Sequence, residues 1–125
     1  MEIFAKPAVG AIIEKDINGV LHILIQERYK KDDNLENGLI EIPAGKVREY
    51  ENIFDALRRE IQEETGLIIT EIQGEKETVV CNCNEYTVIS FNPFYSSQNL
   101  CGGYSIMLQT FICKATGKSL QQSDE

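Results

Sequence analysis

The sequence has no apolar run long enough to span a membrane. Its first residues, Met1 to Pro7, lack both the basic segment and the sustained apolar stretch of a signal peptide. We therefore expect a cytoplasmic protein with no membrane partner. Basic residues are scarce as well, because 12 Lys and Arg stand against 20 Asp and Glu, a net charge of −8. A nucleic-acid partner needs a basic surface, so we expect none, whereas a small phosphorylated ligand stays open because metal ions can neutralise it.

The four cysteines lack the spacing of a typical zinc site. Cys81 and Cys83 form one Cys-x-Cys pair, and Cys101 and Cys113 do not form a second one. On a strand, the paired thiols would point to the same face. We expect four free thiols that pack as small apolar residues in a reducing compartment, with a metal–thiolate site as the alternative.

The composition predicts one domain over residues 1–125, because 42% of the residues are hydrophobic and 26% are charged. Asn18-Gly19 is a tight-turn signal and predicts an opening hairpin. β-branched and alternating segments predict the strands, at about 8–14, 20–28, 39–42, 67–72, 77–83, 86–91 and 105–114. Residues 29–38 and 92–103 have no period and are predicted to be loops. The second of these is long enough to suggest contact with a substrate.

One helix is predicted from about Asn52, a suitable N-cap, to about Glu64, and Gly66 would end it in the left-handed conformation. Three glutamates near its end have the i, i+3, i+4 spacing of neighbours on a helix face: Glu60, Glu63 and Glu64. The apolar face of the helix runs directly into them, through Ile53, Ala56 and Leu57. Carboxylates partly withdrawn from water repel one another, and a hard divalent cation such as Mg²⁺ compensates this charge. A solvated acidic helix is the alternative.

These residues resemble the signature of the Nudix hydrolases. That signature is Gly, five residues, Glu, seven residues, then Arg-Glu-apolar-any-Glu-Glu-any-Gly-apolar, and residues 45–67 match it at every specified position. The resemblance implies an α/β class fold, the Nudix α/β/α sandwich, with a mixed β-sheet and a loop-helix-loop metal platform. It also implies Mg²⁺-dependent hydrolysis of the pyrophosphate bond in a nucleoside diphosphate linked to another moiety, with Mn²⁺ as a substitute metal.

The resemblance also implies a role for each matching residue. Metal ligands are expected among five residues, namely the side chains of Glu60, Glu63 and Glu64 and the backbone carbonyl of either Ala44 or Gly45. Glu60, Glu63 and Arg59 are the candidate catalytic residues, and Arg59 is expected to support the platform together with Glu51 and Gly66. Arg28, Phe94 and Tyr95 are candidate substrate contacts, since aromatic rings can stack on a base.

The general base is the open point of this assignment. Many ADP-ribose pyrophosphatases use a glutamate on the loop before the last sheet strand, and residues 92–103 contain no Asp or Glu. Either Glu60 or Glu63 takes the proton, or an acid elsewhere does so, or the activity is weak. The run at residues 40–45 resembles the Glu-apolar-Pro-Ala-Gly run of ADP-ribose and nucleotide-sugar pyrophosphatases, which favours such a substrate. Relatives that hydrolyse nucleoside triphosphates more often carry Pro-Gly-Gly there.

Two other functional classes stay open, namely a non-catalytic Nudix module that binds a nucleotide and a structural calcium site. The calcium loop's alternating acids with a central glycine are absent. Nudix domains usually continue with a further strand and helix after the point where residues 115–125 end, so we expect a fold that lacks its C-terminal elements. An uncovered sheet edge or apolar patch would favour a homodimer.

Overall fold

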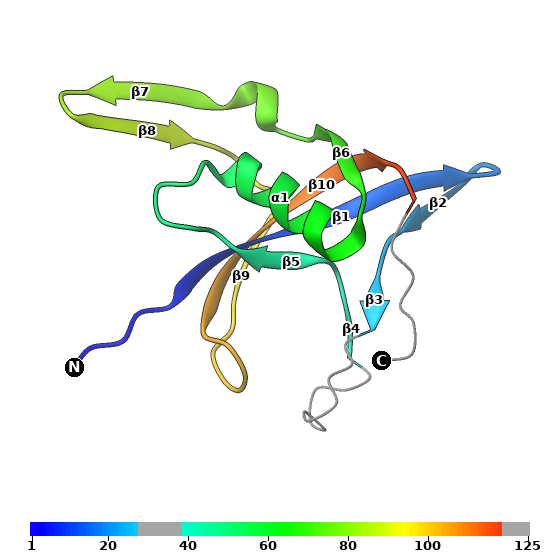
Figure 1. The fold of residues 1–125 in the computed structure, drawn as a ribbon, viewed down its shortest axis with the longest axis horizontal. Helices are drawn as coiled ribbons and strands as arrows, with labels where there is room; N and C mark the ends of the chain where they lie inside the picture. The colour runs from blue at the N-terminus through cyan, green and yellow to red at the C-terminus, as the bar shows by residue number, and fades with distance from the viewer. Residues whose placement is uncertain (28–38, 119–125) are drawn as a thin grey trace.

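The computed structural model describes residues 1–27 and 39–118. Along the chain its elements are β1 (Lys6–Ile17), β2 (Val20–Ile23), β3 (Gln26–Glu27), β4 (Ile40–Glu41), β5 (Ala44–Lys46), α1 (Ile53–Thr65), β6 (Ile68–Ile72), the 3-10 turn η1 (Glu75–Glu77), β7 (Val79–Cys83), β8 (Tyr86–Ser90), β9 (Tyr95–Gln98) and β10 (Ile106–Thr116). Figure 1 shows α1 lying across one face of a curled sheet, with the β7–β8 hairpin projecting beyond it.

The central sheet is mixed, as expected. Strands β1 and β10 run parallel at its centre, with Lys6 opposite Ile106, while β2, β5, β6 and β9 add antiparallel pairs. The strand order is β2-β1-β10-β6, with β5 also pairing to β1 and β9 to β10. Because side chains alternate along a strand, Val9 and Ala11 face α1 whereas Gly10 faces away, toward Ile42 and Leu108.

Helix α1 covers one face of this sheet through the apolar side that the sequence predicted. Ala56, Leu57 and Ile61 have no solvent exposure, and they pack in one cluster with strand residues such as Phe111. The ring of Phe54 meets that of Phe111 edge-on at 5.3 Å. Burial of this face fixes the rotation of α1 and thereby decides where its glutamates point.

Both ends of α1 are closed as expected. The side chain of Asn52 accepts a hydrogen bond from the Phe54 N–H at 2.8 Å. Gly66 adopts the left-handed conformation with φ 79°, and its N–H donates to the Gln62 carbonyl. Thr65 is buried and donates to the Ile61 carbonyl at 2.6 Å, which closes the last turn of the helix from inside the core.

The fold class and most elements are confirmed, and the structure corrects several boundaries. Residues 92–103 are not one loop, because β9 forms inside them and pairs with β10. The predicted strand at 20–28 is interrupted between β2 and β3, and η1 replaces the start of the strand predicted at 77–83. Strand β5 was missed. Within residues 1–27 and 39–118 there is one α-helix, so the second helical layer of a sandwich is not found there.

The cysteines only partly follow the expectation. All four are free thiols, but Cys81, Cys83 and Cys101 are exposed and only Cys113 is packed in the core. Burial raises the pKa of the Cys113 thiol to about 12, which makes it unreactive. Among the described residues, no helix has the length and apolarity needed to cross a bilayer.

Candidate active site

Strand β5 and helix α1 approach each other so closely that only glycine fits at the contact. A Cβ atom at Gly45 would collide with the side chain of Glu60. Gly45 pairs with Val9 of β1, which anchors β5 to the central sheet while Glu60 projects from the helix opposite. The first glycine of the motif is therefore needed because it lets a carboxylate lie against the β5 backbone.

Arg59 connects the start of the motif to its end. Its guanidinium donates to both oxygens of Glu51, at 2.8 and 2.9 Å, and to Glu60 at 2.7 Å. It also donates to the Lys46 carbonyl at 3.0 Å, which ties the helix to β5. Glu63 is farther out, with its carboxylate 3.5 Å from Arg59 and a side chain that is 58% exposed.

This network also fixes the charge of the residues that form it. The hydrogen bond from Arg59, with a further one from the Arg48 N–H, lowers the pKa of Glu51 to about 2. The same hydrogen bond raises the pKa of Arg59. Both groups stay ionised over the whole physiological pH range. Arg59 and Glu51 thus hold the platform together, which is the supporting role that the sequence assigned to them.

Glu64 lies on the other side of Glu60 and has a different environment. Its Oε1 accepts from the side chain of Gln26 at 3.0 Å and from the Ala44 N–H at 3.3 Å. Loss of solvation raises the pKa of Glu64, although these two hydrogen bonds act in the opposite direction, and the nearby charges of Glu60 and Glu41 raise it further. Both of these donors are uncharged, so neither neutralises the negative charge of the Glu64 carboxylate.

Two residues at this site were not recognised as site residues from the sequence. Gln26 of β3 pairs with Glu41 of β4, and this small sheet brings both next to Glu64. Glu41 adds a half-buried carboxylate close enough to influence the pKa of Glu64. Only the position of Glu41 just before the Pro43-Ala44-Gly45 run could have indicated it, because the pairing joins segments on either side of residues 28–38.

The donor set fits a hard divalent cation. Glu60 and Glu64 supply carboxylate oxygens beside the Ala44–Gly45 backbone, with the charge of Glu41 nearby, and Mg²⁺ prefers oxygen donors. Among the described residues, no three acidic, His or Cys side chains already converge closely enough to form a complete metal shell. A cation here would therefore depend on backbone carbonyls, water or substrate phosphate oxygens for its other ligands, as Mg²⁺ commonly does.

A cavity of about 270 Å³ lies beside this platform, on the sheet face that α1 does not cover. Ala44 and Gly45 form one wall, and Ile42, Ile106 and Leu108 supply apolar surface. At its rim, the Lys46 ammonium lies 4.9 Å from the centre of the Tyr104 ring. The cavity therefore combines an apolar floor and an aromatic ring with the ammonium group of Lys46 and the carboxylate of Glu41.

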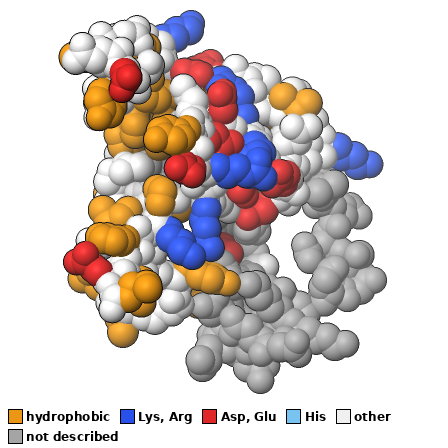
Figure 2. Space-filling view, turned by 60° about the vertical axis from the view of Figure 1, so that its left-hand side comes forward, with side chains coloured by type: hydrophobic (Ala, Val, Ile, Leu, Met, Phe, Trp, Pro, Cys, Tyr) orange, Lys and Arg blue, Asp and Glu red, His pale blue; other side chains and the backbone are white. Residues whose placement is uncertain are grey.

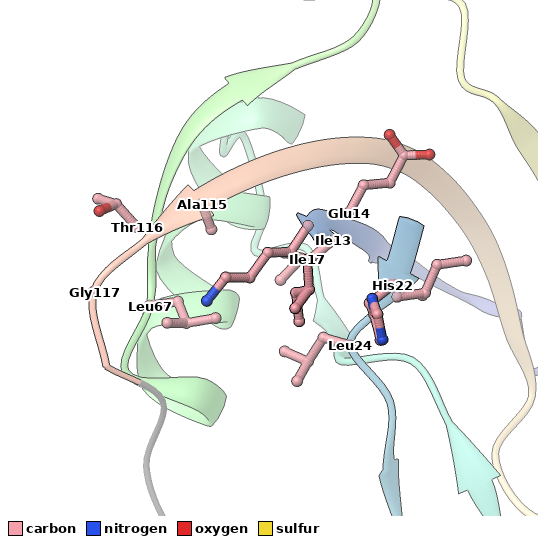
Figure 3. Close-up of a pocket in the computed structure, with 11 residues that line it drawn as sticks. Ile13, Glu14, Ile17, His22, Leu24, Leu67, Ala115, Thr116 and Gly117 are labelled. Carbon is pink, nitrogen blue, oxygen red and sulfur yellow. The ribbon is translucent and has the colours of Figure 1, made fainter. Parts of the chain in front are cut away.

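Another cavity, of about 430 Å³, lies near Leu67 and the β1–β2 hairpin (Figure 3). Ile13, Leu24 and Ala115 supply apolar surface, and Glu14, Lys15 and His22 are the ionisable groups that line it. None of the three motif glutamates lines either cavity, but the smaller one includes Ala44 and Gly45, the β5 residues that lie against Glu64 and Glu60. We therefore place the candidate site beside the smaller cavity.

The structure does not bring the predicted substrate contacts to the carboxylates. Tyr95 of β9 pairs with Thr110 of β10, Thr110 pairs with Gly10 of β1, and Gly10 pairs with Ala44 of β5. Three strand spacings, or about 14 Å, therefore separate Tyr95 from Ala44. Phe94 and Tyr95 are exposed at that edge. Arg28 lies outside the described residues. The substrate role of all three stays a prediction.

Comparison with known proteins agrees with this geometry. A family model described as a NUDIX domain matches residues 5–125. The chain is also 44% identical over 45 residues to an 8-oxo-dGTP diphosphatase of Buchnera aphidicola subsp. Acyrthosiphon pisum (strain APS). That match covers 36% of this chain and 32% of the relative, so the chain spans about a third of the length of this curated protein.

Proposed function

Because the chain belongs to the Nudix family, we propose that it hydrolyses a phosphoanhydride bond in a nucleoside diphosphate derivative, with Mg²⁺ bound at the end of α1 and Mn²⁺ as a substitute. The observation that carries this proposal is the contact between α1 and β5. There Glu60 and Glu64 lie against the backbone of Ala44 and Gly45, and Glu64 carries a charge that desolvation disfavours. Binding of a cation to such a site lowers its free energy, because the cation neutralises the desolvated charge.

The residues of the platform would have different roles in this reaction. Bound Mg²⁺ would neutralise charge on the phosphate oxygens and lower the pKa of the attacking water. Glu60 and Glu64 would hold the metal, and Arg59 positions Glu60 through the 2.7 Å hydrogen bond. Glu60 or Glu63 remains the candidate base from the sequence, and Glu41 is a further nearby carboxylate that could accept the proton of water.

The cavity next to Ala44 supports a nucleoside as part of the substrate. Its apolar wall and the Tyr104 ring fit a planar base, and Lys46 at the rim fits a phosphate. The cavity shares Ala44 and Gly45 with the platform, and Glu41, whose charge raises the pKa of Glu64, also lines it. This arrangement favours nucleotides over inorganic pyrophosphate.

ADP-ribose or a nucleotide sugar is our first substrate assignment, because residues 40–45 resemble the Glu-apolar-Pro-Ala-Gly run of pyrophosphatases that act on these substrates. A nucleoside triphosphate is the second, because the Buchnera relative is named as an 8-oxo-dGTP diphosphatase. The two classes give different products. Attack on ADP-ribose yields two phosphate monoesters, AMP and ribose 5-phosphate, whereas hydrolysis between the α- and β-phosphates of a triphosphate yields a nucleoside monophosphate and pyrophosphate.

The test is a panel of ADP-ribose, nucleotide sugars, dNTPs and 8-oxo-dGTP, each incubated with protein and millimolar Mg²⁺ and separated by anion-exchange chromatography. We expect turnover that EDTA abolishes, with ADP-ribose or a nucleotide sugar hydrolysed fastest. Faster release of pyrophosphate from triphosphates would select the second assignment. No turnover with any substrate, together with a melting temperature that rises when a nucleotide is added, would instead indicate a binding module.

A further inference from the structure

Strand β7 carries two cysteines that lie two positions apart, Cys81 and Cys83. Because side chains alternate along a strand, both thiols belong to the same face of the hairpin, and Asn82 between them belongs to the other. Both cysteines are free and exposed, although the sequence suggested that they pack as small apolar residues. The two sulfur atoms are therefore neighbours on one surface and are open to solvent.

The hairpin fixes the spacing of the two cysteines. Strand β7 pairs with β8 over its whole length, so its backbone is extended at both positions. On the other face, the hydroxyl of Thr87 donates to the side chain of Asn82 at 2.8 Å, which links the two strands at the centre of the pair. Asn84, with φ 56°, forms the tight turn directly after Cys83. The cysteines thus lie on a regular and well-defined piece of backbone.

The surroundings of the two thiols are apolar and contain little charge. Val88 lies opposite Cys81 and is 52% exposed, while Tyr86 lies opposite Cys83 and is 71% exposed. Residues 78–92 contain a single charged side chain, that of Glu85. Figure 2 shows hydrophobic side chains gathered at this end of the molecule. Such a surface offers sulfur donors and few carboxylate oxygens, which is the opposite of the α1 platform.

The distance between the two cysteines favours a bridging metal ion over a disulfide bond. A rise of about 3.3–3.4 Å per residue separates their Cα atoms by about 6.7 Å. This separation is at the long end of the range that a disulfide spans, so an internal disulfide would have to bend the strand. A metal ion with two thiolate bonds of about 2.3 Å needs sulfur atoms about 4.6 Å apart. Cysteine side chains that lean along the strand toward each other reach this distance.

We propose that Cys81 and Cys83 together bind one Cu(I) ion, or another soft ion that accepts two ligands. The number and the type of the ligands select this ion. A structural zinc ion takes four ligands, and the described residues contain no group of three His, Cys, Asp or Glu side chains placed to hold a metal. Thiolates prefer Cu(I) to hard cations such as Mg²⁺, which bind oxygen.

Binding would exchange protons for the metal without any redox step. Two S–H bonds lose their protons to solvent, two S–Cu bonds form, and copper stays Cu(I) throughout. The complex then carries one negative charge in place of two neutral thiols, and the low local charge of residues 78–92 limits repulsion. The site uses none of the platform residues, so the inference does not rest on the proposed hydrolysis.

Competition with the chromogenic chelator bicinchoninate, under anaerobic conditions with Cu(I) supplied as its bicinchoninate complex, tests the ligands. We expect the wild-type protein to withdraw one Cu(I) per chain. Cys81→Ser and Cys83→Ser should each abolish this withdrawal. Cys101→Ser, at the third exposed cysteine, is the matched control and should bind as the wild type does. Withdrawal that persists in Cys81→Ser or Cys83→Ser, that is lost in Cys101→Ser, or that is absent in the wild type overturns the proposal.

Native mass spectrometry tests whether one chain holds the ion. The expected species is the 14.1 kDa chain with one copper ion added and two protons lost. A copper ion found only between two chains would contradict a site made by Cys81 and Cys83 of the same strand. Excess Zn²⁺ or Mg²⁺ should not displace the copper, and displacement by either would show that the site is not selective for soft ions. Neither serine substitution should change Mg²⁺-dependent turnover, so this site and the proposed hydrolysis can fail separately.

Discussion

The α1 platform and the β7–β8 hairpin expose side chains to solvent in opposite ways. On the platform, the polar groups of Glu51, Arg59, Glu60 and Glu64 have named partners within the same domain. On the hairpin, the exposed residues are mostly apolar and touch little of the body. On our proposal the platform binds a cation and a small phosphorylated ligand, whereas the hairpin meets the core of the domain mainly through Ile89.

The strongest test of the platform is Glu64→Gln. Removal of one charge from the metal ligands should lower turnover by about 100-fold or more, measured as product released with millimolar Mg²⁺. Because desolvation raises the pKa of Glu64 above the normal carboxyl value, the metal-free variant should melt at or slightly above the wild-type temperature. Near-normal turnover with an unchanged circular dichroism spectrum would refute the assignment of Glu64 as a ligand.

Substitution of two neighbouring arginines distinguishes a residue that acts at the site from one that only stabilises the fold. Arg59 positions Glu60, whereas Arg58 makes a two-bonded ion pair with Glu75, at 2.6 and 2.8 Å, outside the site. Arg59→Met should reduce kcat by roughly 10–100-fold, because Glu60 loses the group that orients it. Arg58→Met should leave kcat unchanged and lower only the melting temperature, by a few degrees. Equal effects of the two substitutions on kcat would show that Arg59 has no special part in the reaction.

Gly45→Ala tests the close approach of β5 to α1. The new Cβ collides with the flexible side chain of Glu60, which can move aside while the backbone stays in place. We expect about a 10-fold loss of turnover with a melting temperature within a few degrees of the wild type. The double variant with Glu60→Ala removes the collision, so Gly45→Ala should cost little further activity in that background. A full additional 10-fold loss there would mean that Gly45 acts by another route.

The smallest effect concerns pH and the Glu51–Arg59 pair. The pKa of Glu51 in the folded protein is about 2, below its ordinary value of 4.5, so the pair stabilises the protein fully above about pH 4.5 and less as the pH falls toward 2. Glu51→Gln should therefore lower the melting temperature at pH 6, and the difference from the wild type should shrink as the pH falls below 4.5. A difference that stays constant down to pH 3 would contradict this linkage.

The sequence predicted best what depends on neighbouring residues. The bounds of α1, its Asn52 and Gly66 caps and its buried face follow from local spacing, and all were predicted correctly. Strand β9 was missed because Ser96, Ser97 and Gln98 are polar residues at a sheet edge, and only pairing with β10 makes them a strand. Gln26 and Glu41 joined the site through a pairing of distant segments, which periodicity does not reveal.

The parallel pairing of β1 with β10 has a consequence for synthesis of the protein. Lys6 pairs with Ile106 and Ile13 with Cys113, so every partner is 100 positions away along the chain. Closing a loop of this length must precede the gain from its contacts, which slows folding. During translation, Val9 and Ala11 therefore lack their central neighbour, β10, until about 100 further residues have been made. The nascent polypeptide exposes both this unfinished centre and the apolar hairpin at the same time, and in this interval it is most vulnerable to aggregation and most dependent on chaperones.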